Sequence, residues 1–294
     1  MPNRSFRARA LSFQVATALA FAILPHAIEA QGAAATAAAA SVPPATPSQL
    51  ADITDRGRAL AGYQRAAWRA YSRLLATKPD PRLVQRYIAY RADSGWVVAF
   101  GRLSVTRDTF YVSNVAIPAV VGGSRSDTLF DIETPTTPGA DTDFLVRAAR
   151  AIDTATALFW PSGRPYETAV LPAAGGSWWV YVIPAANRAG VWPLGDDMRF
   201  RVSGDGRTIL EARRMHVGII EYDRTLRPED TRYTAGVHNT VTSEVPEDTD
   251  VYHVLTRQPR VFEYVFTPHF LYMVNEDGTI RFVLGRGTLI GTSP

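Results

Sequence analysis

The chain has 294 residues, of which 46% are hydrophobic and 20% are charged, and its formal net charge at neutral pH is +3. This length and apolar content predict a folded chain with a substantial core. The small net charge and the lack of a basic run exclude a dedicated nucleic-acid partner, and the absence of cysteine excludes disulfides, thiolate nucleophiles and cysteine-ligated zinc.

Residues 1–30 are typical of a signal peptide. Three arginines precede an apolar run over residues 11–24, and Ala30 ends the segment at the expected cleavage site. The run is shorter than the ~20 apolar residues that span a bilayer. We therefore expect an exported protein, periplasmic or secreted, with no transmembrane segment after cleavage; an uncleaved membrane anchor is the alternative.

Residues 31–50 are rich in alanine, proline, serine and threonine. Such a composition cannot bury enough apolar surface to offset the entropy of ordering. We expect a disordered tether here.

The first folded elements follow the tether. Apolar residues at steps of three and four over 55–76 predict a helix, which Pro79 ends. Strand-like runs with short turns follow at 83–90, 96–103 and 109–117, which is typical of an antiparallel meander. Residues 52–120 are therefore expected to form a helix plus a β-meander.

A loop-rich stretch over 118–142, with one strand near 128–132, is the best internal boundary. A second helix is predicted over 143–159, and the runs that follow it are strand-like: 166–171, 178–183, 198–202 and 208–213. The predicted fold class is α+β, mainly antiparallel sheet with two main helices and one short C-terminal helix. Residues 140–284 form the second half, and residues 52–284 are expected to make one compact unit.

Three of the five histidines fall between residues 236 and 283. His238 lies in a predicted strand over 233–242 that leads into a short helix after Pro246. Asp250 and His253 are three residues apart and share a face of that helix. A metal ion or a proton relay could collect these three side chains; the alternative is that the acids merely cap the helix and favour its dipole.

The same residues resemble the JAB/MPN (JAMM) zinc-dependent isopeptidases, over the C-terminal half of the chain. The helix over 143–159 matches the family's helix, Glu167 its catalytic glutamate, and His238 the first histidine of its His-x-His motif. The segment Pro246-Glu247-Asp248-Thr249-Asp250 is similar to its Pro-Ser-x-x-Asp segment. The resemblance implies amide or isopeptide hydrolysis, with His238 and Asp250 as zinc ligands and Glu167 as base.

The chain departs from this family at two positions. Thr240 stands where the second histidine is expected, and Glu247 replaces the serine that supports the oxyanion. A catalytic zinc needs three protein ligands, so a third must come from elsewhere. His253 or His269 could supply it.

Four functions stay open. The broken motif favours a non-catalytic binding or envelope-associated domain, whose partner is an unknown protein or small-molecule ligand. The alternative is a zinc-dependent hydrolase of amide or peptide bonds, which uses His238, Asp250 and another histidine as ligands and Glu167 or Glu247 as general base. An enzyme with an unrecognised site and a purely structural envelope protein are the remaining two, and the Gly-x-Ser-x-Gly elbow of serine hydrolases is absent.

Overall fold

The longest element of the computed structural model, which describes residues 42–161, 163–224 and 235–285, is helix α2 (Pro47–Leu75). It begins eight residues before the predicted start because Thr46 and Gln49 form a capping box, in which the Gln49 amide donates to Thr46 Oγ1 at 3.3 Å. Pro47 at the first helical position is also favourable. The predicted tether therefore ends inside a helix, and its earlier part and the signal peptide lie outside the described residues.

The first sheet is an antiparallel meander in the order β1-β2-β3-β4. A short strand, β5, also pairs with β3. The stretch predicted as loop over 118–142 is thus largely strand. The bounds are β1 (Arg86–Ala92), β2 (Gly95–Leu103), β3 (Phe110–Val121), β4 (Ser124–Glu133) and β5 (Gly139–Asp141).

Helix α3 (Phe144–Thr156) leads into a second antiparallel sheet, in the order β10-β9-β7-β6. The main hydrophobic core lies between α2, α3 and the inner faces of these two sheets. A short 3-10 helix, η1 (Ala174–Gly176), precedes β7. The strands are β6 (Tyr166–Pro172), β7 (Trp178–Pro184), β9 (Met198–Val202) and β10 (Ile209–Arg214).

Two smaller sheets complete the described fold. One is the antiparallel pair β8 (Val191–Gly195) and β11 (Ile219–Asp223). The other has the order β12-β13-β14-β15, in which β12 and β13 run parallel with helix α4 (Asp248–Thr256) between them in the chain. Its strands are β12 (Gly236–Asn239), β13 (Glu263–Phe266), β14 (Phe270–Val274) and β15 (Ile280–Gly285).

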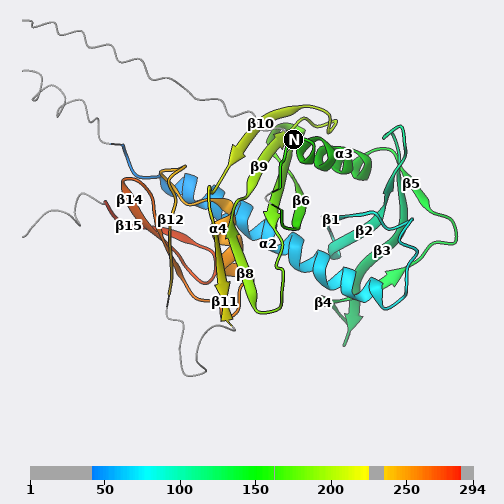
Figure 1. Ribbon diagram of the computed structural model, residues 1–294. Coiled ribbons are helices and arrows are strands. Elements are labelled where there is room, and N and C mark those ends of the chain that lie inside the picture. Colours follow the sequence, from blue (N-terminus) through cyan, green and yellow to red (C-terminus); the bar gives the residue numbers. More distant parts are fainter. Residues whose placement is uncertain (1–41, 162, 225–234, 286–294) are drawn as a thin grey trace, which may run out of the picture. The chain divides into compact units, whose positions relative to one another are not determined.

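Helices α2 and α4 pack closely. Gly57 makes this possible, because a Cβ at that position would collide with the side chain of Val251 on α4. Figure 1 shows α2 passing α4 on its way to the strands of the first sheet. A second, smaller core lies between α2, α4 and the last sheet.

The predicted α+β class is confirmed: the described residues form mostly antiparallel strands, two longer helices and one short helix, α4. Among the described residues, no helix is long and apolar enough to cross a membrane.

Candidate metal centre

Three buried side chains from different elements converge on one point. Nε2 of His216 and Nε2 of His238 each lie 3.1 Å from Oδ1 of Asp250. One nitrogen or oxygen from each of the three lies within 4.8 Å of those of the other two, so the set could hold a metal ion. The two imidazole rings are inclined at 69° with centroids 5.7 Å apart.

These three atoms also lack hydrogen bonds. Despite the 3.1 Å separations, neither contact with Oδ1 has hydrogen-bond geometry, and among the described residues none of the three atoms has another partner. Buried polar atoms are nearly always hydrogen-bonded. Three such atoms pointing at one another therefore indicate a binding point for a ligand that contacts all three, such as a metal ion.

A buried carboxylate orients the His216 ring. His216 lies in the turn between β10 and β11, and Asp197 lies in the turn between β8 and β9. Asp197 Oδ1 accepts a hydrogen bond from the backbone amide of His216 at 3.0 Å and lies 2.9 Å from Nδ1 of its ring. With Nδ1–H bound to this carboxylate, Nε2 is left as the free nitrogen.

A second carboxylate does the same for His238 on β12. Glu263 Oε1 lies 2.9 Å from Nδ1 of His238 and also accepts from the Tyr222 hydroxyl at 2.5 Å. Arg257 donates to the other oxygen of Glu263 at 2.5 Å. Gly236 stands opposite Glu263 in the parallel pair, and a Cβ there would collide with the Glu263 carboxylate.

The helix start orients Asp250. Asp250 is the third residue of α4, and its Oδ2 accepts from the backbone amide of Glu247 at 2.7 Å, as in a capping box. Oδ2 is therefore engaged by the helix cap while Oδ1 faces the two imidazoles. Asp250 therefore serves both of the roles that the sequence suggested, as a helix cap through Oδ2 and as a candidate ligand through Oδ1.

The charges favour a cation. Burial alone would lower the pKa of both imidazoles, but the neighbouring carboxylates outweigh this effect. Asp197 and Asp250 raise the pKa of His216 well above its usual value. Asp250 and Glu263 raise the pKa of His238 to about 9. Burial would raise the pKa of Asp250, but the two histidines hold it well below its usual range.

The same balance can be counted in charges. Three buried carboxylates, those of Asp197, Asp250 and Glu263, face the two imidazoles and the guanidinium of Arg257. With both imidazoles neutral, the group carries two excess negative charges. Two protons or one divalent cation would balance them.

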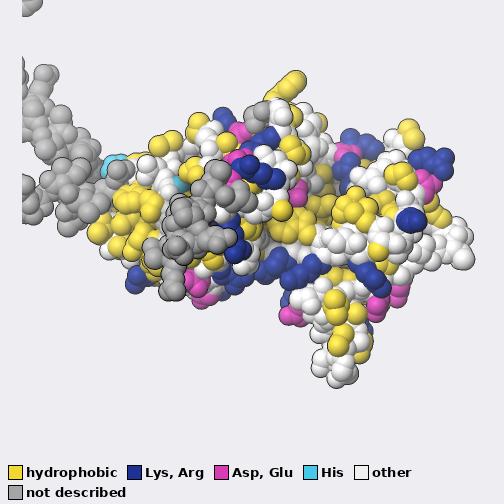
Figure 2. All heavy atoms as spheres, turned by 60° about the horizontal axis from the view of Figure 1, so that its bottom comes forward, with side chains coloured by type: hydrophobic (Ala, Val, Ile, Leu, Met, Phe, Trp, Pro, Cys, Tyr) yellow, Lys and Arg dark blue, Asp and Glu magenta, His cyan; other side chains and the backbone are white. Residues whose placement is uncertain are grey.

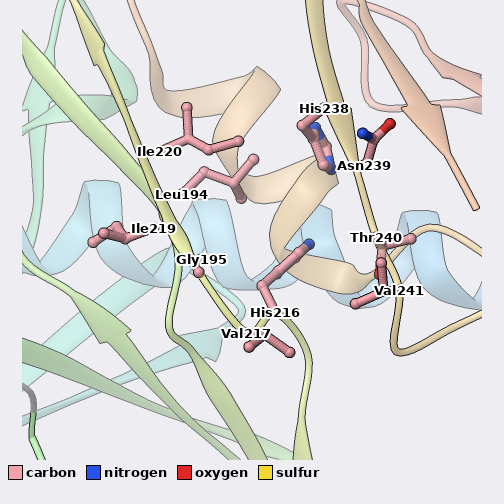
Figure 3. A pocket seen from close by; sticks show the side chains of 11 residues that line it. Leu194, Gly195, His216, Val217, Ile219, Ile220, His238, Asn239, Thr240 and Val241 are labelled. Atoms are coloured by element: carbon pink, nitrogen blue, oxygen red, sulfur yellow. The ribbon is translucent and has the colours of Figure 1, made fainter.

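The cluster borders a pocket of about 130 Å³. His216 and His238 line it together with apolar side chains from β8 and β11 and the end of β12. Figure 3 shows the strands that carry Leu194 and Ile220 on one side, and on the other β12 with His238 and Asn239, followed by Thr240. The pocket therefore lies against the two histidines, whose Nε2 atoms are themselves buried.

Two of the three predicted metal ligands, His238 and Asp250, lie in the cluster. His253 does not: its ring packs on Tyr222, with centroids 4.5 Å apart. Burial, and to a lesser extent the charge of Arg257, lowers the pKa of His253 to about 3. His269 is exposed and lies 2.7 Å from Glu244 Oε1. Among the described residues, the third member of the cluster is His216, which the sequence did not predict as a ligand.

The two predicted general bases occupy different surroundings. Glu247 precedes α4 and pairs with Arg213 at 2.5 Å; burial raises its pKa to about 7 although Arg213 opposes this. Glu167 lies on β6 and accepts from Trp68 Nε1 at 3.0 Å, and burial raises its pKa. No contact of Glu167 joins it to the three ligands, whereas Glu247 is bonded to Asp250 through its backbone.

A neighbouring ion-pair network anchors the start of α4. The carboxylate of Asp248 is fully buried and accepts hydrogen bonds from Arg199 at 2.7 Å and from the Tyr181 hydroxyl at 2.8 Å. It also forms an ion pair with Arg56 of α2 at 3.0 Å. It ties α4 to α2 and to the second sheet. Asp250, two residues later, is thereby held at a fixed point.

Comparisons of the chain with protein-family models, with curated proteins and with solved structures give no match. The similarity to the JAB/MPN family therefore stays a prediction. Function has to be argued from the site, because a fold class does not determine chemistry.

Proposed function

We propose that this chain is a metal-dependent hydrolase of amide bonds, with zinc held by His216, His238 and Asp250. The observation that carries the proposal is the convergence of three buried ligand atoms without hydrogen bonds. Each imidazole presents Nε2 because a carboxylate occupies Nδ1. Metal-binding histidines usually have such a carboxylate or carbonyl partner.

The ligand set favours zinc. Two imidazole nitrogens and one carboxylate oxygen suit zinc and related transition metals better than magnesium or calcium, which prefer all-oxygen sites. Structural zinc sites have four protein ligands, whereas catalytic sites have three and keep one position for water or substrate. Three ligands beside a pocket fit the catalytic kind.

The chain's own residues suggest how a substrate would lie. Leu194, Val217 and Ile220 give the pocket an apolar wall, suited to an apolar side chain next to the scissile bond. When bound, the metal ion acts as a Lewis acid that polarises a carbonyl and makes water a better nucleophile. Glu247, whose pKa burial raises to about 7, is the candidate to accept a proton near neutral pH.

The similarity to JAB/MPN enzymes supports the same reaction. Two of its implied ligands, His238 and Asp250, belong to the cluster. In this proposal His216 supplies the ligand that Thr240 cannot. With the signal peptide predicted over residues 1–30, the expected place of action is outside the cytoplasm.

A second candidate is a non-catalytic domain in which the metal only holds the fold or a ligand. One observation favours it: among the described residues that line the pocket, none is a carboxylate. Glu247 would then serve only Arg213 and the start of α4. Hydrolytic activity separates the two candidates.

The first experiment is elemental analysis of protein purified without chelator, beside His216→Ala, His238→Ala and the exposed control His269→Ala. We expect about one zinc per chain in the parent and control, and loss of zinc in both cluster variants. Hydrolysis of a peptide library that stops with a chelator and returns with zinc would support the hydrolase. Bound zinc without hydrolysis would leave the non-catalytic domain, and absence of metal from a folded parent would overturn both.

A further inference from the structure

The fold gathers five arginines around a second pocket, which lies at the C-terminal end of α4, whereas Asp250 of the metal centre lies in its first turn. The pocket has a volume of about 600 Å³ and shares no lining residue with the pocket at the metal centre. Its arginines come from α2, β1, β4 and the segment after α4: Arg65, Arg69, Arg91, Arg125 and Arg260. Figure 2 shows basic side chains gathered along the middle of the face in view.

Among residues 42–161, 163–224 and 235–285, none of these five arginines forms an ion pair with a carboxylate within 4.0 Å. Asp127 is the one acidic residue in the lining. The backbone carbonyl of Asp127, not its carboxylate, accepts from Arg69 at 3.1 Å.

The guanidinium groups are also crowded. Burial lowers the pKa of Arg65, and the charges of Arg260 and Arg69 lower it further. Arg260 donates to a backbone carbonyl at 3.0 Å, and Arg91 stacks over Trp96 at 5.6 Å from its ring centroid. Most of the donors of these guanidinium groups are therefore free to bind an anion.

An apolar pocket of about 620 Å³ adjoins this one. The two share Gly62, Arg65, Arg91 and Trp96 in their linings. The rest of its lining is mainly aromatic and aliphatic, including Tyr90, Phe144 and Leu171, and the charged residues Asp55, Arg56 and Arg58 also border it. A molecule that lies across the shared residues would place one end among the five arginines and the other against these apolar groups.

We infer that this paired pocket binds an amphiphilic phosphate, with a multiply charged phosphate group among the five arginines and an apolar chain in the adjoining pocket. Arginine forms bidentate, charge-assisted hydrogen bonds to phosphate oxygens. A di- or triphosphate carries enough charge to neutralise several guanidinium groups at once. The sequence alone gives no sign of this site, because its arginines are scattered between residues 65 and 260.

The test is calorimetric titration of the full chain with inorganic pyrophosphate and with geranyl diphosphate. We expect geranyl diphosphate to bind roughly tenfold more tightly or better, because burial of apolar surface adds to the phosphate contacts. The double variant Arg65→Ala/Arg260→Ala should lose about tenfold or more for both probes. Arg73→Ala, at an exposed position of the same helix outside both pockets, is the control.

Three results would overturn the inference: equal binding of the two probes, no effect of the double variant, or an equal loss in Arg73→Ala, which would indicate long-range attraction only. The His238→Gln variant is measured in parallel, because diphosphates also bind metal ions. Undiminished binding in that variant supports a site independent of the metal centre, whereas loss of binding would assign the phosphate to the metal and refute the arginine site. Vesicles of phosphatidylcholine with and without phosphatidic acid then distinguish a lipid ligand from a soluble one.

Discussion

Glu263 Oε1 lies 2.9 Å from Nδ1 of His238, on the side of the ring opposite Asp250. This carboxylate decides which imidazole nitrogen is free, because Nδ1–H is used in the hydrogen bond. The free Nε2 then faces Oδ1 of Asp250 at 3.1 Å. The metal-binding proposal depends on this orientation as much as on the ligands themselves.

Replacing Glu263 by glutamine should therefore weaken the metal site without removing a ligand. We expect zinc affinity to fall about 10- to 100-fold, as for other partners of metal-bound histidines. Competition with a zinc-binding dye measures the change. Glu244→Gln, which alters the carboxylate beside the exposed His269, is the control, and an equal loss in that variant would contradict the assignment.

The pH dependence of stability should change sign with the metal. Without metal, the folded-state pKa of His238 is about 9, above the unfolded value of about 6.5. Its contribution to stability is then fully present below pH 6.5 or so and is lost as the pH rises through about 9. With zinc, both imidazoles must be deprotonated, so the stabilisation by zinc grows as the pH rises.

Thermal unfolding in chelator and in excess zinc across this pH range measures both trends. We expect the melting temperature to fall with rising pH in chelator, and the difference between the two conditions to widen. A difference that stays constant with pH would argue against histidine ligands.

Gly236→Ala should disturb the metal centre from the backbone. The added Cβ would collide with the Glu263 carboxylate and displace the group that orients His238. We expect a destabilisation of about 1–3 kcal/mol, typical of overpacking, together with weaker zinc binding. Gly218→Ala is the matched control, because a Cβ there meets nothing within 4 Å although Gly218 also lines the pocket.

Asp248→Ala should be among the most destabilising single substitutions at α4. It leaves the cations of Arg56 and Arg199 without their buried partner, which typically costs about 3–5 kcal/mol. Urea unfolding measures the loss. Asp277→Ala removes the partner of Arg58 in an exposed pair and should cost at most about 1 kcal/mol; a similar loss in both variants would contradict a special role for Asp248.

The periodic elements could be predicted from the sequence, and the irregular ones could not. The strands β6, β7, β9 and β10 follow apolar and β-branched runs that local pattern reveals. Strand β8 was missed because Pro193 and Gly195 argue against a strand. A strand is possible there because proline is tolerated in edge strands, and among the described strands β8 pairs only with β11.

The metal centre was predictable only in part, for a related reason. His238 and Asp250 are close in sequence and lie on a strand and the helix that follows it, so spacing connects them. His216 lies in a turn of another sheet, and its partner Asp197 lies in a second turn. Only the tertiary fold brings these turns to α4. The one local indication that His216 is buried was its position between the apolar residues Met215 and Val217.

Asp197 and His216 lie in turns of the second and third sheets, whereas His238, Asp250 and Glu263 belong to the β12-α4-β13 unit. An ion shared by His216, His238 and Asp250 would cross-link these two parts of the fold in a chain that has no cysteine for a disulfide. Such a cross-link stabilises the folded chain because the ion binds the native site and not the unfolded chain, and it can be opened by a chelator or by acid. Loss of the ion would then free the two walls of the pocket to move apart, and amide hydrogen exchange in β11 and β12 would rise before that of the main core.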